Sequence, residues 1–467
     1  MMHAMTSWMP DPATLTRPAY RSLAQAITTA IDDGRLRPGD RLPTHRDLAW
    51  KLGLSVQTVS RAYEALIRAD AVTGEVGRGT FVKSAPVEGR APPYQQIDSG
   101  DPAIDCSMLT PVSSALHTEA MARTLAEMSG TVRAETLFSF RPRQALRRSA
   151  EAGLRWLAGC GLSTRADLVL ATNGATPAMT VALMTAAAPG DLVVTEAAGH
   201  HTLKALTRYL GLKLQGLPCD DEGVLPDALG AACQRGARVL YLLPAGNGPL
   251  NAVMGPARRA EIVSVARRHD MAIVENDAWG PLEPDRPAPL AMLAPERVFY
   301  FTSLTKCLLP GLRLGWLVVP EAQVTAAFGR HLVTNWMATG LIAEIGARWV
   351  EDSTAWRLLD WQRSQLARRN RMAAAALAGL PMRANPHGLH VWLPLPKGWD
   401  EPGFVNSARL RGVAIAPGSA FHIGPEPAQA QGVRLCLGGP GESDLEQALT
   451  TVARLMRNLP EPDFLTI

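Results

Sequence analysis

Apolar positions repeat with two different periods along the chain, and these periods indicate two kinds of structure. Between residues 20 and 67, apolar residues recur at helical spacing in the stretches 20–31 and 55–67. From residue 167 onward, short continuous apolar runs alternate with longer helical patterns such as 261–268. The runs of strand length are 167–171, 192–195, 239–243, 271–275 and 298–301. This rhythm predicts an α/β body with a mainly parallel, doubly wound sheet that binds ligands at the carboxyl ends of its strands.

The N-terminal part carries the signals of a helix-turn-helix followed by a β-hairpin at 71–82. Thr44 is placed as an N-cap three residues before Asp47, and the short helix that it opens should end near Gly53. In the next helix, at 55–67, apolar residues share one face and leave polar residues near the helix start. Such a recognition helix places short polar side chains and arginines against base edges and phosphates. The candidate DNA contacts are Thr44, Arg46, Gln57, Thr58, Ser60, Arg61, Arg78 and Thr80.

Charge indicates a nucleic-acid partner for this part alone. Residues 14–83 contain eleven Lys and Arg against seven Asp and Glu, a surplus of four that equals the net charge of +4 of the whole chain. The remaining residues therefore sum to zero. A basic module on a neutral body predicts that double-stranded DNA binds the module while the body does another job. We expect domains at 14–83 and 101–467, joined by a flexible linker at 84–100 that is rich in proline and small residues.

Composition narrows the class of protein. At 467 residues, with 47% hydrophobic and 19% charged residues, the chain should fold into more than one domain. Its six cysteines are scattered without the spacing of metal or disulfide motifs, so we expect reduced thiols, no metal site and a cytoplasmic protein. No apolar run reaches the length of a membrane span, and residues 1–10 have no signal-peptide pattern.

The strongest sign of chemistry is a lysine just after the apolar run 298–301. Ser303, Thr305 and Lys306 follow that run, and Arg313 comes seven residues after the lysine. A lysine at the mouth of a buried strand is costly unless its amine is used, and hydroxyls with a guanidinium suit a phosphate. Together they indicate pyridoxal 5'-phosphate (PLP) held as a Schiff base on Lys306. A surface loop with a solvated lysine is the alternative.

A second segment has the pattern of a phosphate site. Residues 172–176, Thr-Asn-Gly-Ala-Thr, follow a predicted strand and precede a helical pattern. Free backbone N–H groups at a helix start bind phosphate well, and Gly174 permits close approach of the ligand. An ordinary strand-to-helix turn is the alternative.

A known family combines these parts. Residues 18–82 resemble the GntR-type winged helix in the segments 18–20, 35–43 and 77–82, and the whole chain resembles the MocR branch of that family. The resemblance implies a transcription regulator whose body has the fold-type I, class I/II aminotransferase fold, and it implies a head-to-tail homodimer. It also implies a phosphate cup formed by Gly174, Ala175, Thr176, Ser303 and Arg313.

Several positions depart from the aminotransferase pattern. Asn276 takes the place of the aspartate that protonates the pyridine nitrogen, and alternation along the strand should point its neighbour Asp277 to the opposite face. Gly248 takes the place of an asparagine that bonds the phenolic oxygen, with Asn247 as a substitute beside it. His200 stands where a tyrosine stacks on the ring. The cofactor contacts expected at these places are Asn276, Trp279, Asn247 and His200.

These departures favour sensing over conversion of the ligand. Transamination needs a protonated pyridinium as electron sink, and a neutral amide does not support that proton. Exchange of Lys306 for an incoming amine needs much less. We therefore expect a regulator without catalytic residues that responds to an amine or amino acid. Arg434, in a segment that resembles the family's carboxylate-binding one, would grip a carboxylate or sulfonate, with a structural salt bridge as the alternative.

Two other functions remain open at this point. The chain could be an active PLP-dependent aminotransferase with a DNA-binding appendage, or a regulator whose body has lost PLP and binds its effector noncovalently. The identity of the effector, the operator sequence and the direction of regulation do not follow from the residues.

Overall fold

The computed structural model describes residues 8–16, 18–32, 35–36, 39–68, 71–75, 79–83, 103–140, 143–246, 248–424 and 431–458. The chain divides into two compact units, Met1–Pro93 and Tyr94–Ile467. The predicted linker at 84–100, Arg78 and Asn247 lie outside the described residues. The finer domain bounds, 14–83 and 101–467, stay predictions.

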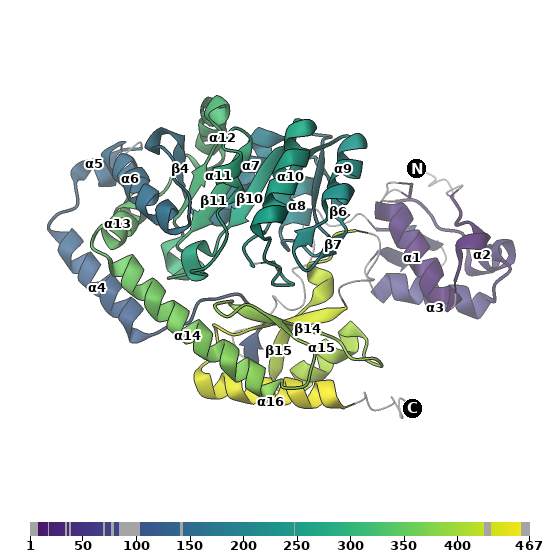
Figure 1. The fold of residues 1–467 in the computed structure, drawn as a ribbon. Helices are drawn as coiled ribbons and strands as arrows, with labels where there is room; N and C mark the ends of the chain where they lie inside the picture. The colour runs from purple at the N-terminus through teal and green to yellow at the C-terminus, as the bar shows by residue number, and fades with distance from the viewer. Residues whose placement is uncertain are drawn as a thin grey trace. The chain divides into compact units, whose positions relative to one another are not determined.

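The first unit has three helices and a two-stranded antiparallel sheet, drawn in purple in Figure 1. Its elements are α1 (Ala19–Asp32), α2 (His45–Leu52), α3 (Val56–Arg68), β1 (Val72–Glu75) and β2 (Gly79–Val82). The apolar face predicted for α3 is confirmed, because Val59, Ala62 and Leu66 are buried in a core shared with α1 and α2. Helix, turn, helix and hairpin thus occur in the predicted order.

The turn between α2 and α3 forms as its residues dictate. The Thr44 side chain accepts a hydrogen bond from the Asp47 N–H at 3.2 Å, so the predicted N-cap is confirmed. Gly53 ends α2 with a φ of 64°, in the left-handed region that favours glycine. The Ser55 hydroxyl then accepts from the Thr58 N–H at 3.1 Å and opens α3.

The second unit is built on a seven-stranded sheet in the order β4-β12-β11-β10-β9-β5-β6 (Figure 1). Within the described sheet, β12 pairs antiparallel with both neighbours and all other pairs are parallel, as the alternating pattern predicts. The strands are β4 (Val169–Thr172), β5 (Leu192–Glu196), β6 (Lys213–Leu217), β9 (Ala237–Leu242), β10 (Ala272–Asp277), β11 (Val298–Ser303) and β12 (Gly315–Val318).

Helices cover both faces of this sheet and create two separate cores. Tyr241 and Val274 face a core with α7 (Ala175–Ala186), α8 (Leu203–Tyr209) and α12 (Val324–Asn335). Leu242 and Ile273 face the core on the other side. That side is covered by α6 (Arg143–Gly159), α9 (Pro226–Gln234), α10 (Pro256–Arg268), α11 (Leu290–Leu293), α13 (Gly340–Glu351) and part of α14 (Thr354–Ala376). Successive residues of one strand therefore serve opposite cores.

A smaller sheet completes the second unit in the order β13-β14-β16-β15-β3. Its strands are β3 (Ile104–Cys106), β13 (Arg383–Ala384), β14 (His390–Pro394), β15 (Val413–Pro417) and β16 (Gly432–Cys436). It packs on α14, α15 (Glu401–Leu410) and α16 (Glu442–Arg457), seen in green and yellow in Figure 1. The first strand of the unit, β3, is thus an edge strand held by β15 alone.

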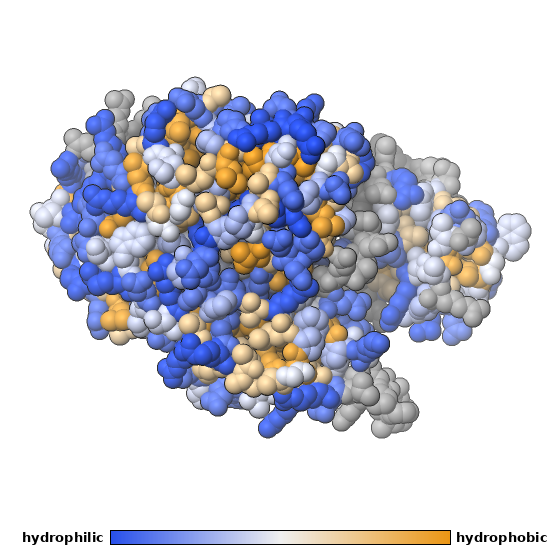
Figure 2. Space-filling model, viewed as in Figure 1, coloured by the Kyte–Doolittle hydropathy of each residue, from blue (hydrophilic) through white to orange (hydrophobic). Residues whose placement is uncertain are grey.

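The remaining described elements are short or peripheral. They are α4 (Ala115–Ser129), α5 (Ala134–Phe138), the hairpin of β7 (Cys219–Asp220) and β8 (Gly223–Val224), and several single 3-10 turns. Figure 2 shows hydrophilic residues over much of the displayed face, with apolar residues in smaller groups. In the parts of the chain that the structure describes, no helix is both long and apolar enough to cross a bilayer.

Candidate functional site

A cavity of about 100 Å³ lies where the large sheet meets the smaller one. The ends of β10 and β11, the loop after β5 and strand β16 all contribute residues. Five predicted site residues line it: His200, Asn276, Trp279, Lys306 and Arg434. The other lining residues are Met108, Leu109, Gly199, His201, Leu243, Pro249, Ala278 and Phe421. The structure thus brings together residues that lie more than 300 positions apart in the sequence, such as Met108 and Arg434.

Lys306 extends into this cavity from the turn after β11. Its Nζ donates a hydrogen bond to the Leu109 carbonyl at 2.6 Å. Burial, followed by the positive charge of Arg434, lowers the pKa of the Lys306 amine to about 8. No carboxylate lies among the residues that line this cavity, so the charged form of the amine has no anionic partner there. A larger share of the amine is therefore neutral and nucleophilic at pH 7.5 than in an ordinary lysine.

The predicted phosphate cup comes together beside the lysine. A Cβ placed on Gly174 would lie 3.6 Å from the Arg313 guanidinium and 3.6 Å from Thr305 Oγ1. Gly174 itself has a φ of 92° and stands just before α7, which begins with Ala175 and Thr176. Thr305 Oγ1 is buried and has no hydrogen-bond partner among the described residues. An N-terminal helix end, a guanidinium and a free hydroxyl thus face one small space, which suits a phosphate.

Ser303 differs from the other members of this cup. It is fully buried, and its hydroxyl donates to the Ala278 carbonyl at 3.1 Å. A phosphate role for Ser303 requires its hydroxyl to turn away from that carbonyl. The structure therefore gives Ser303 a packing role between β11 and the end of β10, and the phosphate contact stays a prediction.

Asn276 and Asp277 point to opposite faces of β10, as the alternation predicts. The Asn276 side chain lines the cavity, where its Nδ2 donates to the Tyr241 hydroxyl at 2.6 Å and its Oδ1 accepts from the Ala278 N–H at 3.0 Å. Asp277 accepts from Arg286 Nη1 at 2.8 Å on the other side of the sheet, where Tyr300 also bonds it. The carboxylate is thus held away from the cavity, and a neutral amide faces it.

Two histidines form one wall of the cavity. The His200 and His201 rings stack with centroids 4.7 Å apart, and His200 Nδ1 lies 2.8 Å from Thr202 Oγ1. Burial and nearby positive charges lower the pKa of His200 well below its ordinary value and that of His201 to about 4. Both rings are therefore neutral at pH 7, and a neutral His200 ring is suited to stack on a pyridine.

Trp279 also lines the cavity. Its indole meets His390 edge to face with centroids 5.6 Å apart, and His390 Nε2 lies 3.1 Å from the Pro249 carbonyl. Trp279 is nearly buried, so it narrows the cavity and offers an apolar surface. Gly248 does not line this cavity.

Two partners hold the Arg434 side chain in the cavity and leave one of its N–H donors free. Its Nη2 donates to the Ser107 carbonyl at 2.8 Å, and its guanidinium lies 4.4 Å from the centroid of the Phe421 ring. Arg434 Nε is buried and has no hydrogen-bond partner among the described residues. No acidic side chain pairs with Arg434 in the described ion pairs, which removes the main support for a structural salt bridge. The arrangement suits a bound carboxylate or sulfonate.

Several lining residues were not among the predicted contacts. Ser107 and Leu109 contribute backbone carbonyls, which leave no mark in a sequence. Tyr241 lies inside the apolar run 239–243, whose pattern predicts a strand and gives no sign of a site residue. For His201, its position next to His200 was a usable signal.

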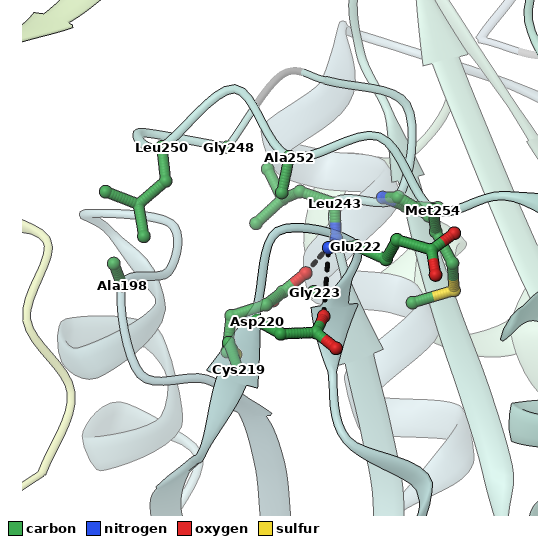
Figure 3. Close-up of a pocket in the computed structure, with 12 residues that line it drawn as sticks. Ala198, Cys219, Asp220, Glu222, Gly223, Leu243, Gly248, Leu250, Ala252 and Met254 are labelled. Carbon is green, nitrogen blue, oxygen red and sulfur yellow. Dashed lines mark hydrogen bonds between the residues drawn. The ribbon is translucent and has the colours of Figure 1, made fainter. Parts of the chain in front are cut away.

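A second cavity of about 30 Å³ lies next to the first and shares Leu243 with it (Figure 3). Figure 3 shows Leu250 and Ala198 on one side of it and Glu222 and Met254 on the other. The Glu196 carboxylate accepts from the Leu243 N–H at 2.8 Å and from Thr195 Oγ1 at 2.9 Å. The half-buried Glu196 carboxylate in the lining of this second cavity therefore already has hydrogen-bond partners within the protein.

The first unit presents most of the predicted DNA contacts at its surface. Thr44, Arg46, Gln57 and Arg61 are exposed, and Thr58 and Ser60 are half-buried. The Arg61 guanidinium lies 4.6 Å from the centroid of the Tyr20 ring, which fixes its direction without neutralising it. Thr80 is only 9% exposed, and the structure therefore favours a packing role for its side chain in the hairpin.

Family comparisons divide the chain in the same way as the structure. Residues 19–82 match the bacterial regulatory proteins of the gntR family, and residues 118–452 match aminotransferase class I and II. The chain belongs to the class I and II aminotransferases and carries a GntR-type domain in front. The predicted MocR-type domain combination is confirmed, and so is PLP as the cofactor on which this aminotransferase family depends.

Proteins named as transcription regulators are similar to this chain over nearly its full length. The HTH-type transcriptional regulator YdeF of Bacillus subtilis is 27% identical over 97% of this chain and 97% of its own. TauR of Rhodobacter capsulatus is 26% identical, covering 93% and 96%. The vitamin B6 salvage pathway transcriptional repressor PtsJ of Salmonella typhimurium is 26% identical, covering 90% and 94%.

Solved structures support the fold of the second unit. Kynurenine aminotransferase of Pyrococcus horikoshii superposes with a TM-score of 0.71 at 22% identity, over 82% of this chain and 98% of that one. An archaeal alanine:glyoxylate aminotransferase gives a TM-score of 0.70 at 20% identity, over 78% and 92%. At these identities the likeness establishes the aminotransferase fold and nothing finer.

Proposed function

We propose that this chain is a transcription regulator that senses a small amine carrying an acid group through PLP held on Lys306. When bound, PLP supplies an aldehyde with which primary amines condense. The observation that carries the proposal is the placement of three incomplete groups. The Lys306 amine and the unpartnered Nε of Arg434 line one cavity, and the unpartnered Thr305 hydroxyl lies in the phosphate cup with Gly174 and Arg313. Buried polar atoms without partners are costly, and a ligand would satisfy them.

Each residue has a distinct task in this proposal. Gly174, Thr305 and Arg313 would hold the phosphate, and His200 would stack on the pyridine ring. Lys306 would attach the cofactor and release it to an incoming amine. Arg434 would orient that amine by its acid group, because a guanidinium binds carboxylates in a fixed fork geometry.

Asn276 supports binding of the amine over its conversion. The amide has an oriented hydrogen-bonding place and no charge, so it does not hold a proton on the pyridine nitrogen. Conversion of an amine needs that proton to stabilise negative charge on the ligand. An active aminotransferase is the second candidate, favoured by the fold of the solved neighbours and by the presence of Lys306.

DNA binding belongs to residues 14–83 in this proposal. The gntR-family match over residues 19–82 supports the assignment, as does the similarity over nearly the full length to YdeF, TauR and PtsJ, which are named as transcriptional regulators or repressors. Phosphate contacts by arginines such as Arg46 and Arg61 make the affinity fall steeply with salt. A head-to-tail homodimer would place two such domains on one operator.

The first test is an absorption spectrum of the purified chain with PLP, beside Lys306→Ala and the surface control Lys213→Ala. The wild type and Lys213→Ala should gain the visible band of covalently held PLP, and Lys306→Ala should not. The same samples, given amino donors, report conversion of the amine. No band in a protein that still binds DNA would contradict PLP sensing and leave a regulator with a noncovalent effector, whereas turnover at enzyme-like rates would favour the aminotransferase.

A further inference from the structure

The two cationic side chains of the cavity both hold one short segment of backbone. This segment, Ser107–Thr110, follows edge strand β3 and is named the strap here. Lys306 Nζ donates to the Leu109 carbonyl at 2.6 Å and Arg434 Nη2 donates to the Ser107 carbonyl at 2.8 Å. The strap is thus bound by the same two side chains that the proposed function assigns to cofactor and effector.

Space on both sides would let the strap move. Met108 and Leu109 line the cofactor cavity, while Met108 and Thr110 line a further cavity of about 550 Å³. Met108 is 45% exposed, although it lies between these two cavities. A segment with a hollow on each side can shift without a rearrangement of the packed core.

Firm contacts bound the strap at its two ends. On one side β3 pairs with β15 from Ile104 to Cys106. On the other side the Gln362 amide, in the orientation that satisfies both its atoms, donates to the Val112 carbonyl at 3.1 Å and accepts from the Val112 N–H at 2.8 Å. Movement would therefore be confined to the few residues between them.

We propose that ligand binding displaces the strap, because PLP takes Lys306 and the effector takes Arg434, the two charged donors that hold it. The weaker Cys436 Sγ contact to the Ser107 carbonyl at 3.4 Å remains. This inference rests on the proposed function. Covalent attachment of Lys306 removes its hydrogen bond to Leu109, and a carboxylate gripped through Nε and Nη2 of Arg434 turns the guanidinium away from Ser107. β3, which is held on one side only, connects the strap to residue 103 and so to the predicted linker at 84–100. The occupied cavity would thereby act on the chain that leads to the DNA-binding domain.

Hydrogen–deuterium exchange of the full-length protein, read on peptides that cover 103–112, tests this inference. The samples are the protein alone, with PLP, and with PLP plus either hydroxylamine or aminooxyacetate. Both probes exchange with Lys306 at the cofactor's aldehyde carbon: the C=N bond to the probe forms, the C=N bond to Lys306 breaks, and the lysine leaves as a free amine. Aminooxyacetate alone adds a carboxylate. We expect exchange to rise about fivefold for each hydrogen bond lost. PLP alone takes Lys306 from Leu109. Hydroxylamine frees the lysine and should return exchange to that of the protein alone, whereas aminooxyacetate should keep it raised because its carboxylate takes Arg434 from Ser107.

Variants separate the strap from general loosening. Arg434→Met should show fast exchange at 103–112 without ligand and no difference between the two probes, and Arg434→Lys should restore part of the protection. Arg330→Met is the matched control, because it removes a hydrogen bond from an arginine to the Met184 carbonyl far along the sequence. It should leave 103–112 unchanged.

The outcomes separate this inference from the proposed function. A PLP absorption band with unchanged exchange at 103–112 in every sample overturns the proposed movement of the strap and leaves the proposed function intact. Absence of the band overturns both. If exchange at 103–112 rises as much in Arg330→Met as in Arg434→Met, the proposed movement of the strap is also overturned, because the effect would then not be specific to Arg434.

Discussion

The two sides of the sheet at the end of β10 differ in whether their buried polar groups have hydrogen-bond partners within the protein. On the α10 face, Glu275 accepts hydrogen bonds from Leu290 and Ala291 and pairs with Arg259, and Asp277 is held by Arg286 and Tyr300. On the ligand side, Arg434 Nε in the cavity and Thr305 Oγ1 in the phosphate cup have no partner among the described residues, and Lys306 donates to the Leu109 carbonyl. The acids on the α10 side thus have partners within the protein, and we call this side the closed face. The ligand side keeps polar atoms without partners in the described part of the chain, and we call it the open face.

This difference separates structural from ligand-binding polarity. Both faces are buried, so burial alone does not distinguish them. A buried charge that has all its partners stabilises the fold as long as none is removed. Buried donors and acceptors that lack partners are kept at a cost, and such a cost is typical of sites that a ligand completes.

The largest effect is expected from breaking the closed face. Asp277→Asn leaves Arg286 buried without its counter-ion, so the free energy of unfolding should fall by about 3–5 kcal/mol. Urea unfolding of the purified protein measures it. Arg368→Met, which breaks the exposed pair with Glu442, is the control and should lose less than about 1 kcal/mol. Equal losses in both variants would contradict the distinction.

A charge added to the open face should change chemistry more than stability. Asn276→Asp places a carboxylate where the amide now faces the cavity, and it should support a proton on the pyridine nitrogen. Conversion of amino donors by the PLP-loaded protein should then rise about tenfold to a hundredfold, the value of a charged hydrogen bond. Single-turnover spectra measure this rate. Asn276→Leu, which has no charge to add, should show no gain.

The lowered pKa of Lys306 predicts a pH profile. The neutral amine attacks PLP, so the rate of covalent capture should fall about tenfold for each pH unit below the pKa of about 8 and flatten above it. An ordinary lysine, with a pKa of 10.5, would keep accelerating up to about pH 10. Stopped-flow absorbance between pH 6 and 10 distinguishes the two profiles.

The smallest effect is expected from one hydroxyl of the open face. Thr305→Val removes an oxygen that has no partner in the part of the chain that the structure describes, so the unfolding free energy without PLP should stay the same. The Kd for PLP should rise about fivefold, the value of one hydrogen bond. Thr172→Val is the contrast, because Thr172 Oγ1 donates to the Gly174 carbonyl at 3.0 Å and its loss should lower stability as well.

Sequence predicted the elements well because each carries a local signal. The strands that end at Asp277 and Ser303 are continuous apolar runs, and α2 begins and ends at a Thr cap and a left-handed glycine. Lys306 and Arg313 were predictable as ligand-binding residues, because burying a lysine after a buried strand costs free energy unless its amine has a function.

The partners of these residues were not predictable in the same way. Ser107 and Leu109 act through carbonyls that every residue possesses, and they reach the cavity from almost 200 residues away in sequence. The packing role of Ser303 and the burial of Thr80 depend on neighbours from other elements. Such facts arise from tertiary structure, which a motif does not describe.

The assignment of alternate β10 residues to two different cores also limits how this domain can evolve. The acid that a converting enzyme needs is one position away, at Asp277, yet a one-residue slip of the strand would move Ile273 and Val274 into each other's cores and leave the Arg286 cluster without its acid. A single codon change at Asn276 avoids that damage. Ancestral enzymes and descendant regulators of this architecture should therefore be separated by substitutions at this position and not by insertions or deletions within the strand.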